Sequence, residues 1–176
     1  KLSILPDKKR QLRRLMKKMF RLLAVSLTAL LFMAADLPAN SARLIQITDL
    51  QKTAQLSKSK NLPILIMFST EGCPYCELLK EDFLLPMIIS GDYTDKILLR
   101  ELHVSDTDQI IDFKGHKIDS YDFARKYAVK LFPTTIFIDS KGLELTPKIV
   151  GVTTPSLFGG RLDSAIDKAA ELLRSK

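Results

Sequence analysis

The sequence is poor in the residues that build metal and haem sites. Its 176 residues include two histidines, two cysteines and no tryptophan. A closed structural zinc site usually needs four ligands, and His103 and His116 stand at no familiar metal-ligand spacing from the cysteines or from each other. The covalent haem signature requires a histidine directly after a Cys-x-x-Cys pair, where this chain has Glu77. We therefore expect both histidines to be solvated or capping residues.

The body of the chain also lacks an excess of charge of either sign. The formal net charge is +7, but residues 1–41 hold nine Lys and Arg against two Asp and Glu, which accounts for all of it. Residues 42–176 hold eighteen of each sign and are formally neutral. Because a nucleic-acid-binding surface concentrates basic residues, the sequence indicates no nucleic-acid partner.

The basic N-terminal segment has the layout of a secretory signal peptide. Lys17, Lys18 and Arg21 precede an apolar run at 22–35, and small residues follow at 38–42. A charged stretch, a short apolar stretch and a small-residue exit are the three parts of such a leader. The apolar run is shorter than the roughly 20 residues that span a bilayer.

Cleavage is expected after Ser41, with Ala42 as the second choice. This predicts a leader at 1–41 and a single mature domain at 42–176 that is periplasmic or otherwise exported. Retention of the leader as a membrane anchor, with the domain facing the periplasm, is the alternative. Since Met16 opens a conventional leader, residues 1–15 need not belong to the native start, and we leave them out of the fold argument.

The two cysteines form one motif, Cys73-Pro74-Tyr75-Cys76, between an apolar run at 62–68 and a helical pattern. A strand that leads into a Cys-x-x-Cys pair at a helix N-terminus suits redox chemistry, because the helix dipole favours the thiolate. Exported cysteines usually form structural disulfides, but a bridge across two residues closes almost no loop and adds little stability. The motif predicts a redox site, with a structural disulfide or a metal-ligand pair as alternatives.

Hydrophobic periodicity predicts alternating strands and helices in the body. Strands are expected at 45–47, 62–68, 97–104, 134–138, 143–145 and 148–152, and helices at 49–56, 74–85, 121–129 and 157–173. Residues 57–61 are predicted to be a polar connection, and 106–120 a polar insertion with a short helix or a hairpin. Pro86 is expected to kink or end its helix, and Pro147 indicates a sheet edge. The alternation predicts an α/β fold.

Two helices are expected to bury aromatic side chains on their apolar sides. In the helix after the motif, Tyr75 and Phe83 belong to the expected buried stripe, and in the helix at 121–129 Tyr121 and Tyr127 do. For Tyr75, a substrate contact beside the thiol is an equal alternative to packing.

Four features, in this order, resemble the thioredoxin superfamily over residues 45–175. They are the strand, Cys-x-x-Cys and helix at 62–85, the helix-to-strand passage at 127–135, the turn at 139–142 and Val150-Gly151 before the last helix. The resemblance implies a thioredoxin-like α/β fold, with a central mixed β-sheet flanked by helices on both faces and a small insertion around 105–120.

The same resemblance implies roles for individual residues. Cys73 would be the nucleophile and Cys76 the resolving thiol, with the Cys73–Cys76 disulfide as the redox centre and no other cofactor or metal. Pro133 would be a cis-proline facing the disulfide, and an ordinary trans proline is the alternative. The expected substrate-binding residues are Pro74, Tyr75, Phe132, Pro133 and Thr134.

The chain departs from the family pattern at two places. Met67 stands where many thioredoxins bury an acid that handles the proton of the resolving thiol, so Glu77 or water would have to substitute. Glu71-Gly72 replaces the usual tryptophan before the motif. The surroundings of the motif look like exported thioredoxin-like proteins of the sulfur-oxidation type, and the passage at 133–139 like those of the cytochrome c maturation type.

The predicted function is a periplasmic thiol-disulfide oxidoreductase that reduces disulfides of exported proteins through a mixed disulfide and receives electrons from a membrane thiol donor. The carboxylates of Glu71 and Glu77 favour a reductant, because negative neighbours disfavour the thiolate. A thiol oxidase or isomerase of the envelope is one alternative. A thioredoxin-like metal-binding or interaction module is another.

Overall fold

The computed structural model describes residue 13, residues 16–18 and residues 42–175. The chain divides into two units, Lys1–Ser41 and Ala42–Lys176. The apolar run of the expected signal peptide and the expected cleavage site at Ser41 lie outside the described residues, so the leader stays a prediction. No helix in the described part of the chain has both the length and the hydropathy of a membrane span.

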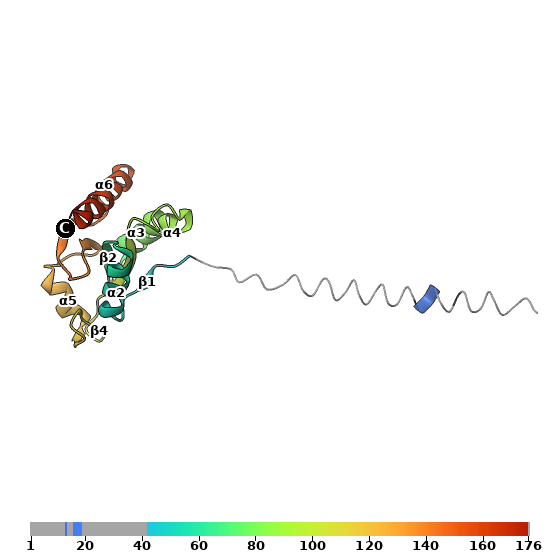
Figure 1. Cartoon of the computed structure of the whole chain (residues 1–176), viewed down its shortest axis with the longest axis horizontal. Coiled ribbons are helices and arrows are strands. Elements are labelled where there is room, and N and C mark those ends of the chain that lie inside the picture. Colours follow the sequence, from blue (N-terminus) through green and yellow to red (C-terminus); the bar gives the residue numbers. More distant parts are fainter. Residues whose placement is uncertain (1–12, 14–15, 19–41, 176) are drawn as a thin grey trace, which may run out of the picture. The chain divides into compact units, whose positions relative to one another are not determined.

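The second unit alternates strands and helices, as the periodicity predicts (Figure 1). Its elements are β1 (Ile45–Gln46), α2 (Leu50–Lys60), β2 (Ile64–Ser69), α3 (Pro74–Leu79), the π-helical η1 (Lys80–Leu84), α4 (Leu85–Ser90), β3 (Leu98–His103), β4 (Gln109–Ile111), β5 (Lys117–Asp119), α5 (Ser120–Lys126), β6 (Thr134–Ile138), β7 (Glu144–Val150) and α6 (Pro155–Arg174).

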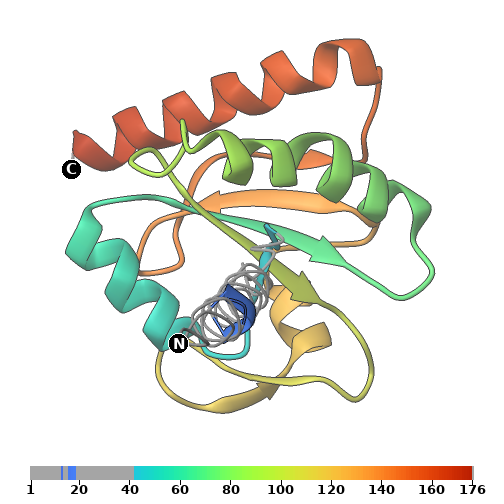
Figure 2. The ribbon, with the colours of Figure 1, turned by 90° about the vertical axis from the view of Figure 1, so that its right-hand side faces the viewer.

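Five strands form one mixed sheet in the order β1-β3-β2-β6-β7. β3 is parallel to β1 and β2, whereas β6 is antiparallel to β2 and β7. Figure 2 shows this sheet between two helical layers, with α6 and the α3–α4 helix on one side and α2 and α5 on the other. The predicted thioredoxin-like arrangement is therefore confirmed.

The central strand β2 supplies side chains to both cores. Leu65 and Met67 pack in the cluster that includes α4 and α6, while Ile64, Ile66 and Phe68 pack in the cluster that includes α2 and α5. All six residues of β2 are buried. This two-sided burial explains the nearly continuous apolar run, because successive side chains of a strand point to opposite faces.

Helix α2 starts where the sequence predicts and ends later. The Asp49 carboxylate caps its N-terminus and accepts a backbone N–H at 3.1 Å, which lowers the pKa of Asp49. The prediction of a polar connection at 57–61 is wrong, because four of those residues complete the helix. Ser57 is buried there and donates its hydroxyl to the carbonyl of Leu62 at 2.6 Å, and Asn61 ends the helix in the left-handed conformation.

The helix after the motif runs through Pro86 instead of ending there. The backbone of η1 has π-helical geometry just before the proline. The N–H of Leu85 donates to the carbonyl of Lys80, five residues back. Pro86 then occupies the first turn of α4, where it has no hydrogen-bond donor to lose.

The polar insertion forms an antiparallel hairpin of β4 and β5, one of its two predicted forms. In α5, Phe123 and Ala124 are buried as expected, as is Tyr127 just after the helix, but Tyr121 is 52% exposed. The expectation for Tyr121 is wrong because it lies two positions, or about 200°, around the helix from Phe123.

The two short strands predicted near the C-terminus are one strand, β7. Its pairing with β6 shifts register between Thr135 opposite Ile149 and Phe137 opposite Thr146, so Pro147 falls in an irregular step. β7 is an edge strand, which tolerates a residue without an N–H donor at a bulge. The predicted edge position of Pro147 is confirmed.

Candidate functional site

The Cys-x-x-Cys motif lies at the carboxyl end of β2. Gly72 makes the turn into the motif with φ +64°, a conformation that suits glycine. Cys73 caps α3, and its Sγ accepts the backbone N–H of Cys76 at 3.2 Å. Pro74 occupies the first turn of the helix. The strand therefore ends in a loop that places a sulfur against the free N–H groups of a helix start.

The structure joins Cys73 and Cys76 in a disulfide. The two sulfurs differ in access, since Cys73 is half-buried and Cys76 is only 1% exposed. An incoming thiol or disulfide therefore reaches Cys73 first. This asymmetry agrees with the predicted roles of nucleophile and resolving thiol, which themselves stay predictions.

Pro74 and Tyr75 lie on the surface beside the disulfide. The Tyr75 side chain is 62% exposed, so the expectation that it packs on the buried stripe is wrong. It belongs to the first turn of α3, which follows directly from the loop beyond the end of the sheet. Leu79, one turn further on, is 1% exposed and is covered by the core.

The expected substrate-binding loop lies at the same end of the sheet as the disulfide. Because β2 and β6 are antiparallel and Phe68 pairs with Thr134, the start of β6 adjoins the end of β2. The Phe132–Pro133 peptide bond is cis, as the resemblance implies. The structure thus brings residues 132–134 and 73–76, far apart in sequence, to one end of the fold.

Residues 131–134 differ in what they offer a partner. Thr134 is buried, and its hydroxyl donates to the carbonyl of Leu131 at 2.7 Å. Pro133 is buried too, and its carbonyl accepts the N–H of Gly151 at 2.8 Å. Phe132 is half-buried, whereas the Leu131 side chain is 64% exposed. Leu131 was not among the residues predicted from the sequence, although a leucine beside a predicted substrate loop is a usable signal.

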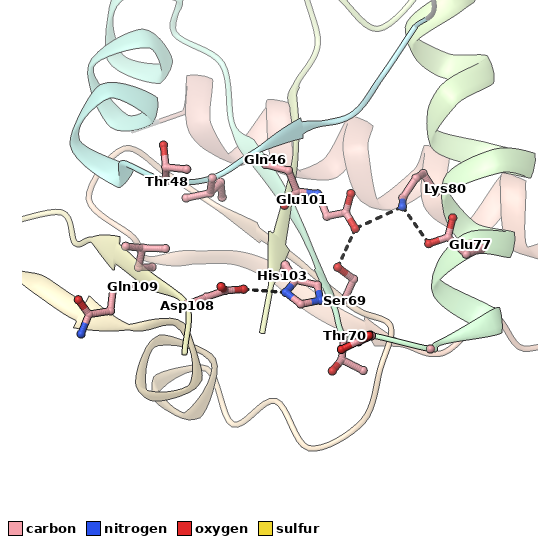
Figure 3. Close-up of a pocket in the computed structure, with 14 residues that line it drawn as sticks. Gln46, Thr48, Ser69, Thr70, Glu77, Lys80, Glu101, His103, Asp108 and Gln109 are labelled. Atoms are coloured by element: carbon pink, nitrogen blue, oxygen red, sulfur yellow. Dashed lines mark hydrogen bonds and ion pairs between the residues drawn. The ribbon is translucent and has the colours of Figure 1, made fainter. Parts of the chain in front are cut away.

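A pocket of about 490 Å³ lies on the other side of the motif, between β1, the loop after β2, α3 and the hairpin (Figure 3). The carboxylate of Glu101 on β3 accepts the Ser69 hydroxyl at 2.7 Å and lies 3.5 Å from the Nζ of Lys80. Lys80 also pairs with Glu77 at 3.0 Å. Burial acts to lower the pKa of Lys80, but the hydrogen bond to Glu77 and the charge of Glu101 outweigh it and raise that pKa.

Glu101 is the buried acid that the sequence analysis did not find. Met67 is fully buried at the position where many thioredoxins have an acid, and its register partner on β3 is Glu101, which is 4% exposed. Glu77, the substitute considered from the sequence, is exposed instead. Only strand pairing could reveal this, because Glu101 is 25 positions from Cys76 in the chain.

Neither histidine contributes to a metal site in the described residues, where no group of three or more potential His, Cys, Asp or Glu ligands occurs. His103 lines the pocket and its Nδ1 lies 2.7 Å from a carboxylate oxygen of Asp108 (Figure 3). This hydrogen bond lowers the pKa of Asp108. His116 lies 3.5 Å from the carboxylate of Asp112 on the hairpin.

Comparison with known proteins identifies a family and similar folds. A model of the thioredoxin-like domain matches residues 50–166. One similar solved structure is oxidized mitochondrial thioredoxin 3 from Saccharomyces cerevisiae, with 22% identity and a TM-score of 0.44 over 68% of this chain and 94% of that one. A poplar thioredoxin h has 19% identity and a TM-score of 0.49 over 70% of this chain and 96% of that one. Oxidized thioredoxin O2 from Arabidopsis thaliana has 21% identity and a TM-score of 0.45 over 72% of this chain and 94% of that one. No curated protein sequence matches the chain significantly.

Proposed function

Because the chain belongs to the thioredoxin-like domain family, we propose that it is a thiol-disulfide oxidoreductase that reduces disulfides in other proteins. One observation carries this proposal. The Cys73–Cys76 disulfide lies at a helix N-terminus with one accessible and one buried sulfur. A bridge across two residues contributes little to stability, so its value is chemical.

The reaction uses the two sulfurs in sequence. In the disulfide form the Cys73 sulfur accepts the N–H of Cys76, and in the reduced protein the same donor would stabilise the Cys73 thiolate, which attacks one sulfur of a substrate disulfide. A mixed disulfide forms and one substrate thiolate leaves. Cys76 then loses its proton and attacks the Cys73 sulfur, which releases the second substrate thiolate. Two electrons pass to the substrate, its two thiolates take up protons from water, and the protein is left with the Cys73–Cys76 disulfide.

The proton of Cys76 needs an acceptor in a buried place, and we assign this role to Glu101. Cys76 and Lys80 are one turn apart on the same helical segment, and Lys80 contacts Glu101. Both Cys76 and Glu101 are buried. A carboxylate with so little exposure, linked to the helix of the thiol through Lys80, can act as the proton acceptor.

We expect Glu101→Gln to slow the resolution step by about tenfold to a hundredfold. Glu77→Gln is the matched control, since it removes the exposed carboxylate that also pairs with Lys80. It should change the rate of the resolution step by less than about twofold. Stopped-flow decay of a mixed disulfide at Cys73, followed against pH, measures both rates. Equal rates for the two variants would assign the proton to water or to Glu77.

Substrate proteins are proposed to dock on the surface formed by Pro74, Tyr75, Leu131 and Phe132. These residues flank Cys73 at one end of the sheet, and two of them expose most of an apolar side chain. Exposed apolar side chains beside a reactive group favour an extended protein segment over a small polar substrate.

The direction of transfer is proposed to be reduction. Lys80 pairs with Glu77 and offsets its charge, so Glu71 is the carboxylate near the motif without an ion pair among the described residues. The helix start therefore offers modest rather than strong stabilisation of the thiolate, which suits a reductant. An envelope thiol oxidase or isomerase is the alternative.

The setting is proposed to be the periplasm or another exported location, in line with the leader at 1–41. Substrates would then be exported proteins with disulfides, and a membrane thiol protein would supply electrons. The resemblance to exported proteins of the sulfur-oxidation or cytochrome c maturation type supports this setting.

The reduction potential of the purified full chain tests the proposed function. We expect a value near that of thioredoxin, about −270 mV, after equilibration with dithiothreitol or glutathione buffers. A value near about −120 mV would make the protein an oxidant. If no reversible couple between Cys73 and Cys76 appears, the redox function itself is wrong.

A further inference from the structure

A second pocket lies at the other end of β3 from the disulfide, in the same unit. It has a volume of about 290 Å³ and lies beside the first residues of β3. Its apolar walls include Ile45 of β1, Leu56 of α2, and Met87 and Ile88 of α4. β1 pairs with β3 only from Arg100 onward, so the β3 edge before that residue has no strand partner in the described part of the chain.

Arg100 lines this pocket and is buried without an acidic partner. It is 8% exposed, and its Nη1 donates to the carbonyl of Leu99 at 2.7 Å. No described residue accepts a hydrogen bond from its Nε or Nη2, and no carboxylate in the described ranges pairs with it. Burial lowers the pKa of this guanidinium, and no neighbouring charge opposes the effect.

Two more cations and no acid line the same pocket. The rest of the polar lining consists of Arg43, Lys60, Tyr93 and Thr94, and neither Arg43 nor Lys60 forms an ion pair with any residue that the structure describes. Register places Arg100 beside Ile45 and Ile66, on the face of the sheet that α2 covers, and Lys60 is the last residue of α2. Three cations without an ion pair in the described part of the chain therefore line one mainly apolar hollow.

We propose that this pocket binds a small amphipathic anion, with a carboxylate or phosphate head and a short aliphatic tail. A buried cation without a counter-charge is costly, and an anionic ligand would remove that cost through charge-assisted hydrogen bonds to the free donors of Arg100. The apolar walls would cover the tail. The volume of about 290 Å³ is just below the usual range for ligand pockets, roughly 300–1,000 Å³, which restricts the site to a small ligand.

The pocket is independent of the thiol chemistry. Its lining shares no residue with the pocket beside the disulfide, and it contains neither cysteine. Redox activity and anion binding can therefore be tested separately in the same protein.

Calorimetry with octanoate below its micelle concentration tests the proposal on the full chain. Octanamide has the same tail but no charge, so it tests the contribution of the anionic head. Inorganic phosphate has the charge but no tail, so it tests the contribution of the apolar walls. We expect octanoate to bind at least about tenfold more tightly than either, because only octanoate has both parts. Phosphate binding as tightly as octanoate would show that the apolar walls take no part and would overturn the amphipathic assignment.

Three variants locate the site. Arg100→Met should weaken octanoate binding at least about tenfold, and Lys60→Gln by about twofold to threefold. Lys58→Gln, the same change on an exposed residue of the same helix turn, should leave binding unchanged. An unchanged circular dichroism spectrum shows that each variant is folded, and the double variant Arg43→Gln/Lys60→Gln repeats the test without touching the core.

Vesicles distinguish a free anion from a lipid headgroup. Binding to phosphatidylglycerol but not phosphatidylcholine vesicles, lost in Arg100→Met, would identify the anion as a membrane lipid. Octanoate binding without such vesicle binding would identify a soluble ligand. Octanoate binding that is absent from the wild-type chain, or unchanged in Arg100→Met, would overturn the proposal.

Discussion

Replacing Cys73 with serine is expected to reduce disulfide-reducing turnover by about a thousandfold or more. The thiolate is the nucleophile in disulfide exchange, and a serine hydroxyl at neutral pH cannot replace it. Cys73 is the accessible sulfur of the pair, so Cys76 cannot take over the attack from its buried position. Reduction of insulin by the full chain with dithiothreitol measures this loss.

Cys76→Ser is the matched variant, because it keeps the attacking thiol and removes the resolving one. It should lose turnover as well but accumulate a mixed disulfide between Cys73 and the substrate, visible by mass spectrometry without reductant. Cys73→Ser should accumulate none. If the adduct instead forms at Cys76 in Cys73→Ser, the two roles are reversed, and turnover retained in both variants would rule out the dithiol mechanism.

Phe68→Ala is expected to have the largest effect on stability, lowering the free energy of unfolding by about 3–5 kcal/mol. Phe68 is fully buried in the central strand, with ring centroids 6.1 Å from Phe123 and 6.4 Å from Tyr127. Truncation removes contacts with α5 and its C-terminal turn at once and leaves a cavity in a rigid, closely packed core. Urea denaturation followed by circular dichroism measures the change.

An exposed leucine provides the control for this variant. Leu157→Ala at a side chain that is 70% exposed should change the free energy of unfolding by less than about 0.5 kcal/mol. Equal effects of the two substitutions would mean that the core around β2 is loosely packed. Because Phe68 pairs with Thr134 at the site, Phe68→Ala should also reduce turnover more than its folded fraction explains.

Local patterns in the sequence were sufficient for most of the strands and for the motif. The apolar run before the motif predicted β2, and the turn chemistry at 139–142 predicted the connection from β6 to β7. Errors arose where tertiary contacts override local preference. Ser57 looks polar and loop-like in sequence, but its buried hydrogen bond to Leu62 lets α2 continue.

Side-chain exposure was less predictable than secondary structure. Tyr75 and Tyr121 have aromatic side chains suited to a buried stripe, yet both are more than half exposed. An apolar residue is covered only where another layer lies over it, and helix periodicity does not say where that layer ends. The exposed Tyr75 is therefore a result of the tertiary structure, and it favours the substrate-contact interpretation over packing.

The sequence by itself determined that the two cysteines can pair, because Cys-Pro-Tyr-Cys separates them by only two residues, which is within one turn where the segment is helical. The tertiary structure alone decided which charges distant in sequence lie near each other. Strand pairing placed Glu101 beside Met67 and left Arg100 buried without a counter-charge among the residues that the structure describes. Register between strands depends on packing across the whole sheet, so contacts between residues distant in sequence cannot be read from either segment alone.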